Sequence, residues 1–309
     1  MDLTTDELLR VAFDAVTEDR AEISGALGTR VLAGAVAGDK APQHPGWADP
    51  EGDRPSSLRA FITTAAELAA LLDTLAPEDW PRATRVQDVT VRKLVEHLVG
   101  AERYLLGQIG RRPGYDAPTR EDHWPVTRLA VTDLVAEPDE LVARAWWLEV
   151  LGLVAACAEL GPDHELAYYH LAGTLRGLLV VRTFELWTHG DDIRRAVGRD
   201  PDLLDEARLS LMVDELMRVL PLGLALSDCA RPGRTARIEL TGPGGGRFDV
   251  PLAPGEPAGD PDIILKATAI DLCRVASNRL APEEFAVMVD GDARLLDPVL
   301  VGAAAFAAD

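Results

Sequence analysis

The hydrophobic pattern of this 309-residue chain changes once, near Pro232, and that change limits the fold more than any other feature. Before it, apolar residues recur three and four positions apart, which is the spacing of one helix face. After it, apolar and polar residues alternate, as in strands with one buried face. The sequence therefore predicts an α+β fold, with a helical bundle over residues 56–225 followed by a small α+β domain over residues 232–309.

Capping residues, glycines and prolines set the bounds of the expected elements. In the bundle, helices are expected at residues 58–75, 91–107, 137–160, 171–197 and 201–220. In the second domain, strands are expected at residues 236–241, 247–252, 262–266 and 285–289, and helices at 269–280 and 293–307. Residues 1–55 are expected to form an N-terminal extension, with a helix at 4–36 and a linker rich in proline and glycine at 38–55.

The composition excludes several classes of partner. Acidic residues outnumber basic ones by 51 to 31, for a net charge of −20, so the surface repels nucleic acids and anionic membranes. No apolar stretch is long enough to span a bilayer, and the first residues lack the pattern of a signal peptide. Three scattered cysteines indicate a reducing, cytoplasmic location without a disulfide framework. A monomer and a homodimer are both open.

A row of ionisable residues on the expected helix at 171–197 carries the main chemical signal. Its members are Arg182, Glu185, His189 and Asp192. Spacings of three, four and three residues put them on one helix face, of the kind that faces a bundle interior. Buried charges there must pair with one another or bind something. Glu185 and His189 can reach one ion, although an ExxxH pair alone is also common on solvated helix faces.

A third metal-ligand candidate, His97, lies at the edge of the apolar stripe of the expected helix at 91–107. Two histidines and one glutamate would leave an open coordination position, as catalytic zinc sites do. A water or thiol bound in that position loses its proton near neutral pH. The sequence therefore predicts a three-ligand divalent-metal site formed by His97, Glu185 and His189.

Three more side chains have candidate roles around this metal site. Asp192, one turn beyond His189, is placed to orient that ligand. Arg182 can pair with Glu185 or receive a carboxylate from a bound molecule. His170 can line a pocket near the start of the helix, or pack or face solvent like an ordinary histidine. Asp192 and Arg182 are thus the candidate catalytic residues, and Arg182 and His170 the candidates for contact with a cofactor.

Two motifs in this chain resemble a known family. The first is V-R-x-L-V-x-H-L at residues 91–98, which follows P-E-D-W at residues 77–80. The second is R-x-F-E-x-W-x-H-G-x-D-I at residues 182–193. Together with the small α+β domain at the end of the chain, they resemble the mycothiol-dependent maleylpyruvate isomerase family over residues 56–300.

The resemblance implies a DinB-like four-helix bundle and a C-terminal domain with a sterol-carrier-like fold. The zinc ligands it implies are His97, Glu185 and His189, with Asp192 as the acidic residue after the last ligand. It also implies mycothiol as the thiol cosubstrate, whose thiolate adds to a small electrophile and either isomerises a double bond or forms a conjugate. Arg274 and Arg279 are candidates to reach an anionic substrate from the C-terminal domain, or ordinary surface residues.

The chain departs from the family pattern just before the helix that carries His97. Relatives commonly have a C-P-G-W turn there, whereas this chain has R-V-Q-D at residues 85–88. The departure leaves the metal ligands intact and the substrate open. Two alternatives also stay open: an enzyme that uses water or another thiol, and a non-enzymatic ligand-binding or regulatory protein whose structural metal takes a fourth protein ligand such as His170.

Overall fold

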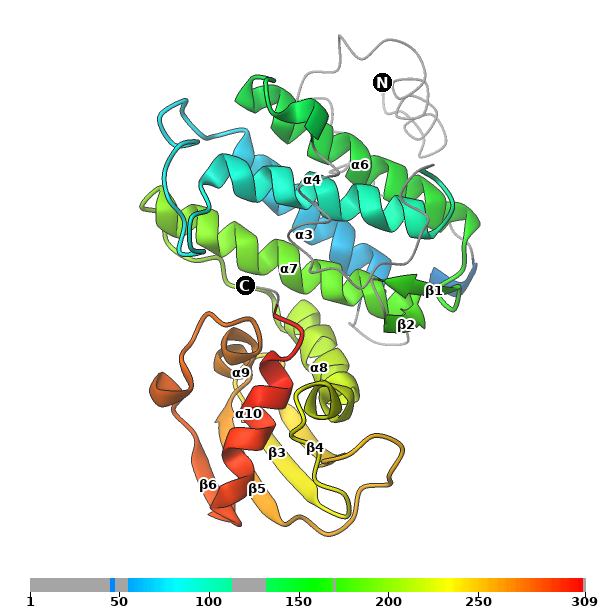
Figure 1. Cartoon of the computed structure of the whole chain (residues 1–309), viewed down its shortest axis with the longest axis vertical. Coiled ribbons are helices and arrows are strands. Elements are labelled where there is room, and N and C mark those ends of the chain that lie inside the picture. The colour runs from blue at the N-terminus through cyan, green and yellow to red at the C-terminus, as the bar shows by residue number, and fades with distance from the viewer. Residues whose placement is uncertain (1–44, 48–54, 113–131, 169–170, 308–309) are drawn as a thin grey trace. The chain divides into compact units, whose positions relative to one another are not determined.

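A computed structural model describes residues 45–47, 55–112, 132–168 and 171–307 of the chain (Figure 1). The chain divides into two compact units, Met1–Asp202 and Leu203–Asp309. The helix predicted at residues 4–36, and most of the linker predicted at 38–55, lie outside the described residues. Among the described helices, none is long and apolar enough to cross a membrane.

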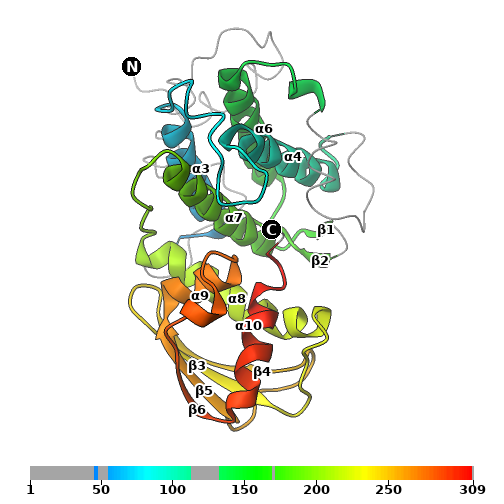
Figure 2. The same ribbon diagram turned by 60° about the vertical axis from the view of Figure 1, so that its left-hand side comes forward.

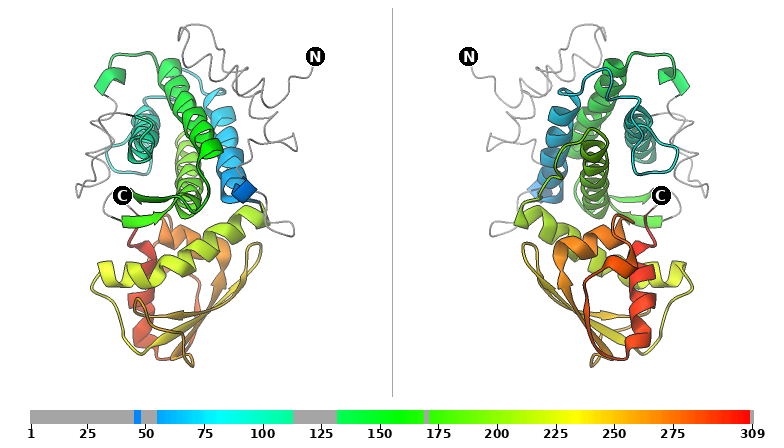
Figure 3. Two further views of the ribbon diagram at one scale, coloured as in Figure 1. Left: turned by 90° about the vertical axis from the view of Figure 1, so that its right-hand side faces the viewer. Right: turned by 90° about the vertical axis from the view of Figure 1, so that its left-hand side faces the viewer.

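A bundle of four helices makes up most of the described first unit (Figures 1 and 3). They are α3 (Ser57–Leu72), α4 (Val91–Gln108), α6 (Asp139–Glu159) and α7 (Leu175–Ala196). Helices α3 and α4 each pack against both α6 and α7, so every helix has two neighbours. The unit also contains the short 3-10 helices η1 (Pro45–Trp47) and η2 (Thr132–Leu134) and a hairpin of β1 (Glu165–Tyr168) and β2 (Leu171–Thr174).

Side-chain caps fix where the bundle helices begin. The hydroxyls of Ser56, Thr90 and Thr174 each accept a hydrogen bond from the backbone N–H three residues later. The helices predicted at 58–75, 91–107 and 137–160 are confirmed to within a few residues. The start predicted for the helix at 171–197 is wrong, because residues 171–174 pair with residues 165–168 as a hairpin before Thr174 caps α7.

Helix α4 is the most deeply buried of the four along its apolar stripe. Val91, Leu94, Val95, Leu98 and Val99 have no exposed surface. Each such side chain contributes about 1.5–3 kcal/mol relative to an exposed one. The stripe is what places α4 against α6 and α7, and with it every polar group that α4 carries on the same side.

The 3-10 helix η1 is tied to the bundle by one buried side chain. The indole N–H of Trp47 lies 2.8 Å from the carbonyl oxygens of both Cys157 and Leu160, at the C-terminal end of α6. Carbonyls at a helix end lack partners within the helix, so this indole satisfies them in place of water. Part of the segment predicted as a linker therefore packs against the bundle.

The second unit is a four-stranded sheet with helices on one face (Figure 2). The strand order is β4 (Gly246–Pro251), β3 (Thr235–Thr241), β5 (Ile263–Thr268) and β6 (Met288–Gly291), and only the β3–β5 pair is parallel. On β3, Ala236, Ile238 and Leu240 are buried, whereas the opposite face carries ion pairs from Arg237 to Asp249 and from Lys266 to Glu239. The predicted α+β class is confirmed.

Helix α8 (Glu206–Leu226) differs from its prediction in two ways. It belongs to the second unit, where it packs against α9 (Ala269–Ala276), α10 (Leu296–Ala304) and β4, although the sequence pattern assigned its residues to the bundle. It also continues through Pro221, which was expected to end it. The reason is tertiary packing: beyond the proline, Gly223 lies directly against α10, and this contact holds the last turn.

The crossing of α8 and α10 leaves no room for a side chain at Gly223. A Cβ atom there would lie 2.1 Å from the carbonyl oxygen of Gly302. We therefore predict that Gly223→Ala lowers the free energy of unfolding by about 1–3 kcal/mol, the usual cost of overpacking. Urea denaturation measures this change. Gly259→Ala is the matched control in the same unit, because its Cβ would meet nothing closer than 3.7 Å; equal midpoints for the two variants would contradict the prediction.

Candidate metal centre

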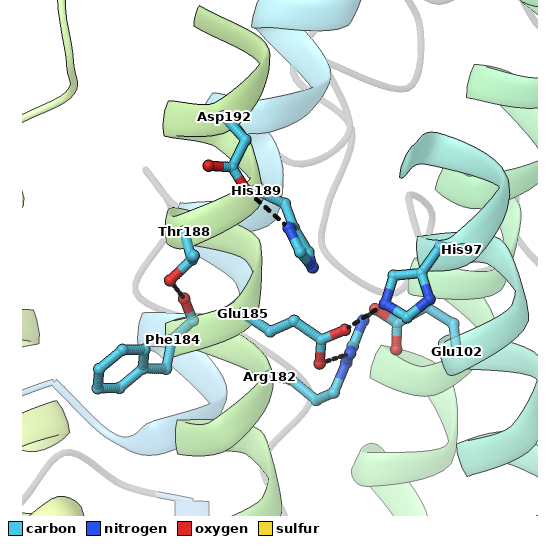
Figure 4. A network of polar contacts seen from close by, with 8 residues as sticks. All are labelled: His97, Glu102, Arg182, Phe184, Glu185, Thr188, His189 and Asp192. Atoms are coloured by element: carbon cyan, nitrogen blue, oxygen red, sulfur yellow. Dashed lines mark hydrogen bonds and ion pairs between the residues drawn. The ribbon is translucent and has the colours of Figure 1, made fainter. Parts of the chain in front are cut away.

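Two helices of the bundle bring three predicted metal ligands together. His97 extends from α4, and Glu185 and His189 extend from α7 toward it, while Phe184 and Thr188 lie on the other side of α7 (Figure 4). One ligand atom from each of His97, Glu185 and His189 lies within 4.8 Å of the other two. Both histidines are only 3% exposed, and Glu185 is partly buried. The cluster predicted from spacing is therefore present in the fold.

The three ligand atoms lie within an ångström or so of the spacing that a zinc-sized ion requires. Tetrahedral ligands at zinc bond lengths lie about 3.4 Å from one another. Nε2 of His97 is already 3.1 Å from Oε1 of Glu185, and the imidazole rings of His97 and His189 stand at 88° with their centroids 5.4 Å apart. An ion among these atoms thus requires the ligands to approach by an ångström or so, which side-chain torsions supply.

The environment of His97 keeps its ring neutral. Burial lowers the pKa of His97 to about 4, and the neighbouring carboxylate of Glu185 only partly opposes this effect. To bind a metal, an imidazole must be neutral, because the ion takes the nitrogen lone pair that a second proton would occupy. His97 therefore needs no deprotonation near neutral pH to bind a divalent ion.

Asp192 contacts the second histidine ligand, His189. Its Oδ2 lies 3.2 Å from Nδ1 of His189, and its side chain is 1% exposed. A carboxylate on Nδ1 favours the tautomer with the proton there, so that Nε2 is free to bind a metal. The other oxygen, Oδ1, lies 4.0 Å from the guanidinium of Arg85, in the turn where the chain departs from the family pattern. This turn thus reaches the edge of the site.

Arg182 lies entirely inside the protein, with no exposed surface. Its Nη1 donates to Oε2 of Glu185, and its Nη2 donates to Oε1 of Glu102 at 2.8 Å. The pairing of Arg182 with Glu185 that the spacing allowed is present. The alternative, in which Arg182 receives a carboxylate from a bound molecule, does not fit a guanidinium enclosed between two carboxylates of the protein.

Glu102 is the member of the site that the sequence did not reveal. It follows Leu98 and Val99 by four and three residues, so it continues the apolar stripe of α4, and it has no exposed surface. A carboxylate on a buried stripe requires a partner, and by this rule the sequence could have indicated that Glu102 forms a buried ion pair. Burial raises the pKa of Glu102, and Arg182 opposes that shift.

The charges at the centre favour a divalent cation. The carboxylates of Glu102 and Glu185 pair with Arg182, the one fully buried guanidinium among these contacts, whereas the buried carboxylate of Asp192 lies against His189. With all three carboxylates ionised and the histidines neutral, three negative charges meet one positive charge, which leaves a net charge of −2. Such an excess is costly in a protein interior, and a divalent ion would neutralise it. The donor set and the charge therefore both fit a metal.

The remaining candidates lie elsewhere or outside the described part of the chain. His170 is not among the described residues. Arg274 pairs with Asp271 on α9, and Arg279 donates to the carbonyl of Ser277, both within the second unit. Neither contact is with a residue of the metal cluster.

Comparison with known proteins identifies the bundle. Residues 61–194 match the model of the mycothiol maleylpyruvate isomerase N-terminal domain. The bundle is thus similar to the N-terminal domain of that family. The family predicted from the two motifs is confirmed, and all three ligand candidates lie within the matched isomerase-family domain.

Solved structures support the same fold over more of the chain. A crystal structure of the mycothiol-dependent maleylpyruvate isomerase has a TM-score of 0.51 at 16% identity and covers 75% of this chain and 91% of that one. A crystal structure of its histidine-to-alanine mutant has a TM-score of 0.50 at 14% identity, with the same coverage. No curated protein matches the sequence. At such low identity, the two structures establish the fold of the chain and nothing finer.

We predict that Asp192→Asn weakens metal binding by about 10- to 100-fold, the usual effect of losing a carboxylate behind a histidine ligand. Competition with a chromogenic chelator measures the affinity. Asp191→Asn is the matched control, because it removes a carboxylate from the neighbouring residue, whose Oδ1 accepts a hydrogen bond from the backbone N–H of Asp202. Equal affinity of the two variants would show that Asp192 does not support the ligand.

Proposed function

We propose that this protein is a metal-dependent, mycothiol-dependent thiol transferase or isomerase that acts on a small electrophile. The observation that carries the proposal is the buried cluster of His97, Glu185 and His189, whose ligand atoms lie within 4.8 Å of one another inside an isomerase-family domain. Three ligands of this type suit Zn²⁺ and leave one position open. When bound, such an ion lowers the pKa of a coordinated thiol, so that the sulfur attacks as a thiolate.

The thiol must come from a cosubstrate, because the bundle offers no reactive cysteine among its described residues. Cys157 is buried in α6, and burial raises the pKa of its thiol to about 12. A thiol with that pKa is protonated at neutral pH and does not act as a nucleophile. This supports an external thiol, and the candidate is mycothiol, on which the maleylpyruvate isomerase of the two solved structures depends.

The protein's own residues would then hold and shield the reacting group. The two histidines and Glu185 would bind the ion, and Asp192, which contacts Nδ1 of His189, would orient that ring. Arg85, 35% exposed and 4.0 Å from Asp192, puts a positive charge at the edge of the site. Because this arginine stands in the turn that differs from the family pattern, we infer that the electrophile differs from that of the relatives. Isomerisation and conjugation both follow from the same thiolate addition.

The alternative function, a ligand-binding or regulatory protein with a structural metal, requires a fourth protein ligand. Structural zinc sites are closed by four side chains, whereas the described cluster has three members. His170, the residue considered for that position, is not among the described residues. Among the described residues, the number of ligands is that of an open site, and binding of a thiol to the metal separates the two functions.

Metal content provides the first test. We expect the purified protein to contain about one equivalent of zinc, and His189→Ala to contain almost none, because two remaining ligands hold the ion weakly. His164→Ala is the matched control, since this histidine lies outside the cluster. Elemental analysis after dialysis measures both variants. A wild-type protein without stoichiometric metal, even after incubation with zinc, would end the proposal.

A panel of thiols provides the second test. Mycothiol, glutathione and cysteine are compared in thermal unfolding of the metal-loaded protein and in conjugation to one reactive electrophile. We expect mycothiol alone to raise the unfolding temperature by several degrees, since a ligand at a hundred times its Kd adds about 2.7 kcal/mol. His189→Ala should lose this shift and the thiol-transfer activity together. If no thiol binds the metal-loaded protein, the structural-metal alternative takes its place.

A further inference from the structure

A continuous line of buried charges connects the metal cluster to a carboxylate deeper in the bundle (Figure 4). Glu102 from α4 binds Arg182 from α7, and Arg182 binds Glu185, which is a member of the cluster. The side chains of Glu102 and Arg182 both have no exposed surface. Solvent therefore does not screen either group, and the pair must be held by contacts within the protein.

The carboxylate of Glu102 depends on the guanidinium of Arg182. Its Oε1 accepts from Nη2 of Arg182 at 2.8 Å, whereas its buried Oε2 has no hydrogen-bond partner among the described residues. The planar guanidinium in turn presents its two terminal nitrogens in fixed directions. Once Nη2 is bound to Glu102, the direction of Nη1 is also set, and Nη1 is the atom that contacts Glu185.

The orientation of Glu185 decides how it can bind a metal. Its Oε2 accepts from Arg182, and its Oε1 lies 3.1 Å from Nε2 of His97, on the side of the other ligands. With one oxygen held by a charge-assisted hydrogen bond, the carboxylate offers the other oxygen to the ion. This arrangement favours a single metal–oxygen bond from Glu185 and keeps the open position from being filled by its second oxygen.

We propose that Glu102 is a positioning residue for the metal centre, which acts through Arg182 to fix Glu185 as a ligand through one oxygen. The inference rests on the proposed function only in requiring that the cluster binds a divalent ion. Neither residue touches the reacting molecules, since both are fully buried. Their effect is on the affinity of the ion and on the number of ligands around it.

A second buried ion pair, which joins α4 to α6, provides a matched control. Arg103, the neighbour of Glu102 on α4, binds Glu149 of α6 at 2.9 Å, and Glu149 is 9% exposed. This pair also links two helices of the bundle across the interior, but neither member contacts a residue of the metal cluster in the described contacts. The charge of Glu149 also acts on Glu102, so a change at Glu149 reports the loss of a nearby negative charge and of a buried ion pair while the contact between Glu102 and Arg182 is kept.

The experiment uses the full-length protein loaded with Co²⁺, whose visible spectrum reports the number of ligands, and a chelator competition that gives the affinity. We expect Glu102→Gln to weaken Co²⁺ and Zn²⁺ binding about 10- to 100-fold, as loss of an outer partner usually does. The visible absorption should fall in intensity, because a released Glu185 carboxylate binds through both oxygens. Glu149→Gln should lower the unfolding temperature without changing affinity or spectrum.

Two further variants separate positioning from charge. Glu102→Asp keeps the charge but is one methylene too short to reach Arg182, so it should weaken metal binding like Glu102→Gln. If charge alone mattered, Glu102→Asp would bind like the wild type, which would overturn the proposal. Arg182→Lys cannot bridge two carboxylates, and on its background Glu102→Gln should add no further loss. An additive loss would also overturn the proposal.

The experiment can still be interpreted if one variant is unstable, and its result is separate from the test of the proposed function. If Glu102→Gln does not fold, Glu102→Asp and Arg182→Lys still test the contact between Glu102 and Arg182, each by changing one of the two partners. A wild-type protein that binds no divalent ion contradicts the proposed function itself. A wild-type protein that binds the ion, with unchanged affinity and spectrum in folded Glu102 variants, contradicts only the role of Glu102.

Discussion

The guanidinium of Arg182 is the group around which the bundle interior is arranged. It lies without exposed surface where α4 and α7 meet, so it can remain charged only beside carboxylates that are buried with it. Glu102 and Glu185 supply them, one from each helix. The apolar stripe of α4 brings the helices together, and the arginine then dictates which polar groups may face one another. The metal cluster is the outer end of this arrangement.

Helix positions could be predicted from the sequence because local rules decide them. Apolar spacing and capping hydroxyls at Ser56 and Thr90 determine where α3 and α4 begin, and the structure agrees. The β1–β2 hairpin escaped prediction because its strands have four residues each, too few for a clear alternation. The sequence did not predict that α8 belongs to the second unit, for another reason. An amphipathic stripe shows that a helix packs against something, but not against which neighbour.

The metal ligands were predictable for a similar reason, and Glu102 was not. Glu185 and His189 share one helix, so their spacing alone puts them side by side. His97 was the third candidate because it lies at the edge of an apolar stripe, and the family motifs agreed with it. Glu102 meets Arg182 only through the register of α4 against α7, which connects residues 80 positions apart in the chain. Long-range register of this kind follows from the packing of whole helices. A carboxylate on an apolar stripe shows that a partner exists without naming it.

Charge balance connects the buried network to the proposed chemistry. A divalent ion would offset the net charge of −2 left by Glu102, Glu185, Asp192 and Arg182, so the same ion that would activate a thiol would also stabilise the folded bundle. A thiol that lost its proton there would add one negative charge to the site. Arg85, partly exposed and 4.0 Å from Asp192, is the described cation at this edge of the site. Under the proposed function, the turn at residues 85–88 would therefore act on the charge of the reacting group.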